Sequence, residues 1–196
     1  MRVEVPEYLN EVVATLSHLA RSSPHVNQRS GVSVRLTVAN SEVLLANATR
    51  RALRLGEKEV VPRVCDLEAL AASTAGKIEI ESLEEGRDEQ IVQNLVKASV
   101  LTVFKEHFNL GSLLEVIGAF DDGRIVHAGD DVPSSTYAEL AASIPALREH
   151  VATLTNDTDS PAAVASATEF ILEGLHLSKR LNKDAAAGRS TYRSRG

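Results

Sequence analysis

Apolar residues recur at intervals of three and four along most of this 196-residue chain, which is the spacing of one face of an α-helix. The clearest early stripe consists of Leu9, Val12, Val13 and Leu16. Ala and Leu dominate, whereas aromatic residues make up only 4% of the chain, and this composition favours helices that pack closely through small side chains. The pattern predicts an all-α fold, with a place for one small β-hairpin in the turn-rich residues 121–135.

Polar breaks divide the chain into three predicted units. Residues 1–82 hold three helical stretches, residues 83–184 hold the remaining helices, and residues 185–196 form a basic tail. The last helix is expected to begin at Pro161 and to carry Leu181 on its apolar line. The tail has no packing signal, so we expect it to be disordered.

The overall charge and the single cysteine exclude several classes of function. A net charge of -6 argues against nucleic-acid binding, since a phosphate-binding surface usually makes a domain basic. Cys65 is the one cysteine, which rules out an internal disulfide and a cysteine-rich zinc site. The chain has no apolar run of the roughly 18 residues that a membrane span needs, and its acidic start differs from a signal peptide. We therefore expect a cytoplasmic location without a membrane partner.

Residues that could carry catalysis by themselves are few. The chain has no G-x-x-x-x-G-K-[ST] phosphate loop, no G-x-S-x-G elbow and no H-E-x-x-H zinc helix. Cys65 lies on the apolar side of its predicted helix, which favours a small buried hydrophobe over a nucleophile. No two of the six histidines are three or four residues apart, so each is interpreted as an ordinary residue. They are His18, His25, His107, His127, His150 and His176.

Two charged clusters also have ordinary structural interpretations. The first contains the four aspartates Asp121, Asp122, Asp130 and Asp131. Their spacing does not match the calcium loop D-x-[DN]-x-[DN]-G, so turn chemistry is favoured and no metal site is predicted. The second contains the three arginines Arg50, Arg51 and Arg54. These are interpreted as a solvated helix C-terminus, where cations suit the helix dipole.

Arg35 is the one charged residue with a sharper interpretation. Ser33 is a plausible N-cap of a long helix, which places Arg35 in its first turn. A cation there is disfavoured by a few tenths of a kcal/mol. It becomes useful where an anion lies opposite, because the helix end and the guanidinium then bind the anion together. Arg35 is therefore a candidate phosphate ligand, and the alternative is an internal ion pair with Glu7, Glu11 or Glu42.

The order of these pieces resembles the lid domain of the MoxR and magnesium-chelatase group of AAA+ ATPases. In that group a G-x-S-x-R-type segment starts a lid helix, which commonly ends in arginines and leads through a V-x-P-like turn to the next helix. The matching positions are Gly31, Ser33, Arg35, Arg50, Arg51, Val61 and Pro62. Val34 departs from the proline that many members carry. The resemblance covers residues 1 to about 80, and the rest looks like the C-terminal extension of the same group.

The resemblance implies a sensor-2 role for Arg35, which would lean over the γ-phosphate of ATP bound with Mg²⁺ in a core domain. The family's phosphate-loop lysine, Mg²⁺-binding acids and arginine finger belong to that core, and the 196 residues contain none of them. We therefore expect a C-terminal fragment of a larger ATPase, with no cofactor on the fragment itself. Its expected partners are its own core domain, neighbouring subunits of a ring, which is a hexamer in the family, and an unknown protein substrate. The parent would remodel protein complexes or assist metal insertion.

Two other classes of function are alternatives to the ATPase lid. A stand-alone helical adaptor would bind protein partners through its Ala/Leu faces, and it would be indifferent to an ATPase core. A helix-turn-helix DNA binder would use the segment before Arg35 as its turn. The net charge and the apolar continuation of the helix argue against DNA binding, since base-reading helices expose polar side chains in their first turns.

The missing phosphate loop leads to a first prediction. The purified 196-residue chain should show no ATP turnover, because it lacks the groups that hold the β- and γ-phosphates and Mg²⁺. The measurement is phosphate release in a single-turnover assay with protein in excess. Release above a no-protein control would contradict the lid interpretation.

Overall fold

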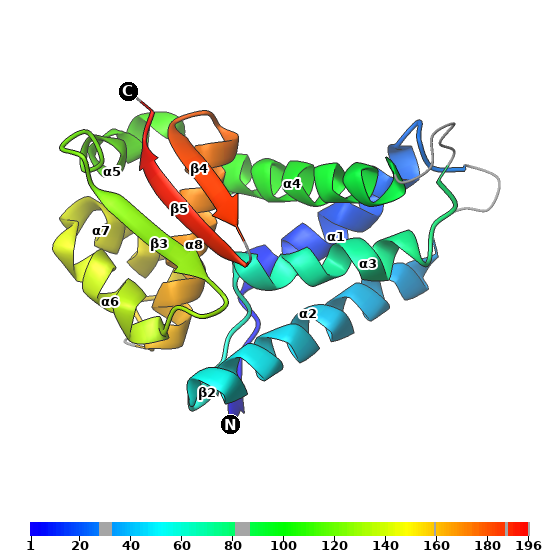
Figure 1. The fold of residues 1–196 in the computed structure, drawn as a ribbon, viewed down its shortest axis with the longest axis horizontal. Helices are drawn as coiled ribbons and strands as arrows, with labels where there is room; N and C mark the ends of the chain where they lie inside the picture. The colour runs from blue at the N-terminus through cyan, green and yellow to red at the C-terminus, as the bar shows by residue number, and fades with distance from the viewer. Residues whose placement is uncertain (28–32, 81–86, 159, 187, 196) are drawn as a thin grey trace.

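The protein is predominantly helical with a small antiparallel sheet, as Figure 1 shows for the computed structural model. The structure describes residues 1–27, 33–80, 87–158, 160–186 and 188–195. Within these ranges the chain forms eight α-helices and a three-stranded sheet of order β3-β5-β4. The all-α expectation with a small β component is confirmed.

The N-terminal half is a bundle of four helices: α1 (Glu7–Ser22), α2 (Val34–Leu55), α3 (Ala69–Ala75) and α4 (Arg87–His107). Two short parallel strands, β1 (Arg2–Val3) and β2 (Glu59–Val60), pair beside the end of α2. A 3₁₀ turn, η1 (Val64–Glu68), leads into α3. Helix α4 lies along α1 and continues towards the C-terminal half (Figure 1).

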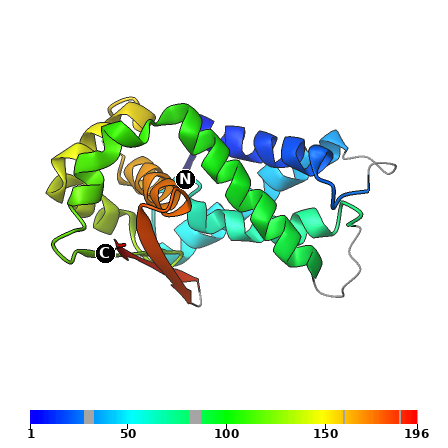
Figure 2. The same cartoon turned by 90° about the horizontal axis from the view of Figure 1, so that it is seen from above.

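The C-terminal half surrounds one buried helix, α8 (Pro161–Leu177). Figure 2 shows α8 between α4 on one side and α6 and α7 on the other. The other helices here are η2 (Leu110–Leu113), α5 (Leu114–Gly118), α6 (Ser134–Ser143) and α7 (Pro145–Thr155). The sheet consists of β3 (Ile125–Gly129), β4 (Leu181–Ala186) and β5 (Arg189–Ser194).

One main hydrophobic core runs through both halves. It joins Leu9 and Leu16 of α1 to Phe104 of α4 and to Phe170 of α8, all of them fully buried. The ring of Tyr8 stacks on Phe170 at 4.6 Å between centroids, which links the first helix to the last. The expected boundary at residues 82 and 83 lies outside the described residues, so the division into two domains stays a prediction.

The prediction of a disordered tail over residues 185–196 is wrong for its described part. Strand β5 pairs with β3 on one side and with β4 on the other, and Tyr192 is buried. The hairpin expected within residues 121–135 is also corrected, because β3 pairs with this distant strand. Helix α8 ends at Leu177, and Leu181 belongs to β4. Local periodicity missed these features because a strand gains its burial and its hydrogen bonds from partners far along the chain.

The ends of α2 follow the sequence signals closely. The Ser33 side chain accepts a hydrogen bond from the backbone N–H of Arg35, which is the expected N-cap. Gly56 adopts a left-handed conformation with φ of 69° and closes the helix, because glycine has no Cβ to oppose it. These two caps fix where a 22-residue helix starts and stops.

Gly174 lets α8 approach α4 very closely. A Cβ atom at this position would lie only 2.0 Å from Cδ2 of Phe104. We predict that Gly174→Ala lowers the unfolding free energy by roughly 1–3 kcal/mol, because a packed core resists an added methyl group. Chemical denaturation measures this change.

Gly118→Ala is the matched control, because a Cβ there would meet nothing within 4 Å. It should change stability by no more than about 0.5 kcal/mol. Equal stability of the two variants would show that the close contact between α4 and α8 does not constrain the core.

Candidate functional site

Arg35 is exposed at the start of α2, as contact with an external anion would require. Among the described residues, its side chain takes part in no hydrogen bond or ion pair, and its backbone N–H donates to the Ser33 hydroxyl oxygen. The internal ion pair that was the alternative is therefore not formed with Glu7, Glu11 or Glu42. Glu11 instead contacts the Nε2 atom of His107 at 2.6 Å.

Two exposed valines lie next to Arg35 on α2. Val34 is 70% exposed and Val38 is 54% exposed, and they are one helical turn apart. Gly31, the first residue of the G-x-S-x-R-type segment, lies outside the described residues. The described part of the predicted site is therefore a capped helix start with a free guanidinium beside an apolar pair.

The interpretation of Arg50, Arg51 and Arg54 as a solvated C-terminus of α2 is wrong for Arg51. Arg51 is only 2% exposed, and its guanidinium binds Asp66, which has no exposed surface. The Nη2 atom lies 2.9 Å from Oδ2 of Asp66 and donates to the carbonyl of Val61 at 2.8 Å. Arg54 is half exposed and pairs with Asp130 at 2.8 Å, whereas Arg50 is exposed. The sequence interpretation failed because η1 places a carboxylate over this end of α2.

A second buried arginine, Arg63, extends the network to the C-terminal half. Its Nη2 atom lies 2.8 Å from Oε1 of Glu57, and its Nη1 atom donates to the carbonyl of Val132 at 2.8 Å. Glu57 also accepts hydrogen bonds from the backbone N–H and the hydroxyl of Ser134, at 2.8 and 2.7 Å. Burial by itself raises the pKa of Glu57, but the bonds from Ser134 and the charge of Arg63 outweigh it, so this pKa is lowered. Glu57 is therefore a charged bridge between the end of α2 and the start of α6.

The network continues from Arg63 to a carboxylate on α8. The guanidinium of Arg63 lies over the ring of Tyr137, 5.0 Å from its centroid. The hydroxyl of Tyr137 donates to Oε1 of Glu169, and the backbone N–H of Cys65 donates to Oε2 at 2.9 Å. Burial raises the pKa of Glu169, since the charge of Arg63 and these hydrogen bonds compensate it only in part. A buried carboxylate with a raised pKa is a common feature of binding and catalytic sites.

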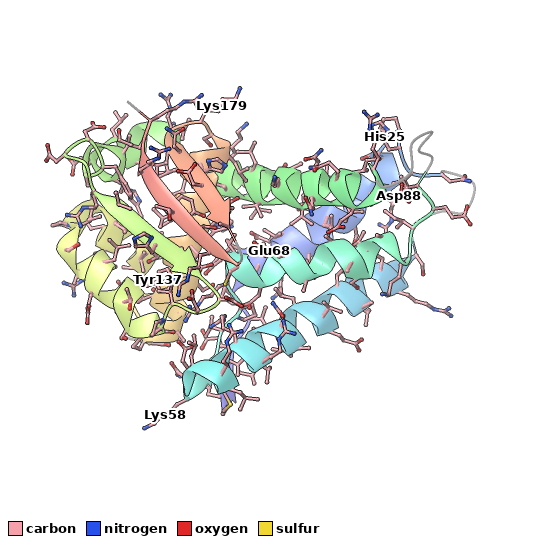
Figure 3. The ribbon with its side chains drawn as sticks, viewed as in Figure 1. His25, Lys58, Glu68, Asp88, Tyr137 and Lys179 are labelled. Atoms are coloured by element: carbon pink, nitrogen blue, oxygen red, sulfur yellow. The ribbon has the colours of Figure 1, made fainter. Side chains whose placement is uncertain are left out.

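Glu169 and Glu173 line a cavity of about 590 Å³ between the two halves of the molecule. Its walls come from η1, α3 and α4 on one side and from α8 and the β4–β5 hairpin on the other. Glu68, at the junction of η1 and α3 and labelled in Figure 3, is one of its exposed lining residues, together with Ala186 and Gly188 of the hairpin. Cavities of this size hold small ligands in many proteins.

The sequence patterns above do not identify the two carboxylates of the cavity. Glu169 and Glu173 stand one turn apart in the otherwise apolar and small-residue segment of α8, and both are buried. Glutamate is rarely buried unless it is paired or functional. Two acidic residues in an otherwise apolar helix are a sequence signal for a buried polar site, but only the fold shows that both line one cavity.

The remaining candidate residues keep ordinary roles. Cys65 is partly buried, and burial raises the pKa of its thiol, so the thiolate nucleophile is disfavoured. Asp130 and Asp131 pair with Arg54 and Arg189 respectively. Across the part of the chain that the structure describes, no three His, Cys, Asp or Glu residues gather as a metal site. Nor does any helix there combine the length and the apolar character that crossing a bilayer requires.

None of the protein-family models, curated proteins and solved structures compared with this chain matches it. The function of this chain is therefore inferred from the geometry and the chemistry of its residues.

Glu57 leads to a prediction of pH dependence. Because its pKa is lower in the folded state than its ordinary value of 4.5, its contribution to stability is complete above that value. It is lost as the pH falls through the lower, folded-state pKa. At neutral pH, Glu57→Gln should lower the unfolding free energy by roughly 2–4 kcal/mol. The substitution removes the negative charge that pairs with the buried guanidinium groups of Arg51 and Arg63. The difference from wild type should shrink as the pH falls below 4.5.

Denaturation at a series of pH values measures this difference, with Glu139→Gln as the control because Glu139 is exposed on α6. The control should track wild type throughout. A difference between Glu57→Gln and wild type that grows on acidification would contradict the assigned role of Glu57.

Proposed function

We propose that this chain acts as the lid of an AAA+ ATPase and supplies Arg35 to the phosphates of ATP bound in a core domain. The observation that carries the proposal is the exposed guanidinium of Arg35, which has no partner among the described residues, in the first turn of a capped 22-residue helix. An anion at this position would meet both the N–H groups of the helix start and the planar donors of the arginine. The resemblance of the surrounding segment to the MoxR and magnesium-chelatase lid supports the same role.

The buried network supports a mechanical part of this proposal. Arg51 ties the C-terminal end of α2 to Asp66, and Glu57 ties the same region to α6 through Ser134. A displacement of Arg35 on nucleotide hydrolysis would therefore move α2 together with the rest of the chain rather than bend it. In the proposed ATPase, Mg²⁺ and ATP belong to the core, and lid movement would be passed to neighbouring subunits of a ring. Its substrate would be a protein complex or a metal-insertion partner.

The alternative of a stand-alone adaptor draws support from the exposed Val34 and Val38. An exposed apolar pair is a common element of a protein-binding surface. The two functions differ in one requirement, because only the lid function depends on the positive charge of Arg35 beside the two valines. Arg35 substitutions therefore separate the two functions.

Arg35→Ala should leave the melting temperature of the chain nearly unchanged, because the Arg35 side chain has no partner among the described residues. In the assembled ATPase the same change should lower turnover by about one to three orders of magnitude, which is what loss of a charge-stabilising group costs. Arg35→Lys should restore little, since a compact ammonium cannot reproduce the planar fork of donors. Thermal melts and steady-state ATPase assays measure the two effects.

Arg148→Ala is the matched control, because Arg148 is exposed on α7, away from α2. It should leave both the melting temperature and turnover unchanged. Wild-type turnover in Arg35→Ala, or a large loss of stability of the isolated chain, would reject the lid role.

A further inference from the structure

The charges around the cavity do not balance. Four carboxylates line it within the described residues, Glu68, Glu89, Glu169 and Glu173, against three cations, Lys97, Lys183 and Arg189. Arg189 pairs with Asp131 outside the lining, and Lys183 pairs with Glu173 at 2.8 Å. Glu169 accepts hydrogen bonds from the neutral donors Tyr137 and Cys65, and the charge of Arg63 offsets only part of the cost of burying its carboxylate.

An acceptor atom in the same cavity is also unused. Oε2 of Glu173 accepts from Lys183 and from the hydroxyl of Tyr192. Oε1 of Glu173 accepts no hydrogen bond from the described residues, although the side chain is only 6% exposed. Glu173 lines the cavity one helical turn from Glu169. The cavity therefore contains both a surplus of negative charge and a free acceptor.

We propose that this cavity binds a ligand that presents an aliphatic guanidinium or ammonium group to Glu169 and Glu173. A cation at this position offsets the negative charge of the lining and donates to the free oxygen of Glu173. The group belongs to a small organic cation or to a basic side chain of an extended peptide, and the volume of about 590 Å³ accommodates either. The proposal is independent of the role assigned to Arg35, which lies on another part of the molecule and does not line the cavity.

Other ligand classes fit this cavity less well. The described residues contain no cluster of three potential metal ligands. An anion would meet Lys97 and Arg189 in the lining, but Arg189 already pairs with Asp131. The innermost polar groups are the two buried carboxylates, which repel an anion. The cavity therefore favours a cation with several N–H donors and a short apolar stem.

The test uses the whole 196-residue chain and four probes. These are butylguanidinium, its neutral isostere butylurea, the anion butyrate, and a capped Gly-Arg-Gly peptide. The reporters are the backbone N–H groups of Cys65, which donates to Glu169, and of Gly129, which donates to Tyr137. Chemical-shift titration of ¹⁵N-labelled protein follows both. Saturable shifts with butylguanidinium or with the peptide, and none with butylurea or butyrate, are expected.

Glu169→Gln and Glu173→Gln should each weaken binding of the cationic probe by about tenfold or more, because each keeps its shape and loses its charge. Glu149→Gln, at an exposed position of α7 outside the cavity lining, should bind like wild type. Saturation by the peptide alone would assign the site to a protein segment, and saturation by butylguanidinium alone to a small molecule. Absence of binding by both cations, or equal binding of butylurea, would overturn the proposal even if the variants do not fold.

Discussion

The pairing of Arg51 with Asp66 is the interaction on which the rest of this structure depends. Asp66 is fully enclosed and accepts from the guanidinium of Arg51 and from the backbone N–H of Arg63 at 2.8 Å. These contacts hold the end of α2 against the turn η1 and the residue that precedes it. An ion pair removed from water tolerates little displacement, because separation would leave two uncompensated charges. The orientation of α2, and with it the position of Arg35, follows from this buried pair.

Helix α8 is the second constraint, because it connects the core to the cavity. Its apolar residues, such as Phe170, meet α1 and α4, and Gly174 allows that contact to be close. Its two glutamates face the network and the hairpin instead. One helix thus contributes both to the hydrophobic core and to the carboxylate-lined cavity. A binding event at Glu169 or Glu173 would act on the same helix that holds the two halves together.

Much of the local structure could be predicted from short-range patterns. The apolar spacing of Leu9, Val12, Val13 and Leu16 placed α1 correctly, and the Ser33 N-cap marked the start of α2. The exposure of Arg35 followed from the cost of burying a guanidinium without a partner. The cavity could not be predicted in this way, because Cys65, Glu169 and Tyr192 are far apart in sequence and meet only in the fold.

The sequence by itself determined the helical class, the capped start of α2 and the exposed arginine beside it, since these depend on contacts within a few residues. Tertiary structure alone decided that Arg51 is buried, that residues 189–194 form a strand, and that two glutamates share a cavity. The physical reason is the same in each case. Burial of a charge and pairing of a strand are set by partners that come from distant parts of the chain, and local periodicity carries no information about them.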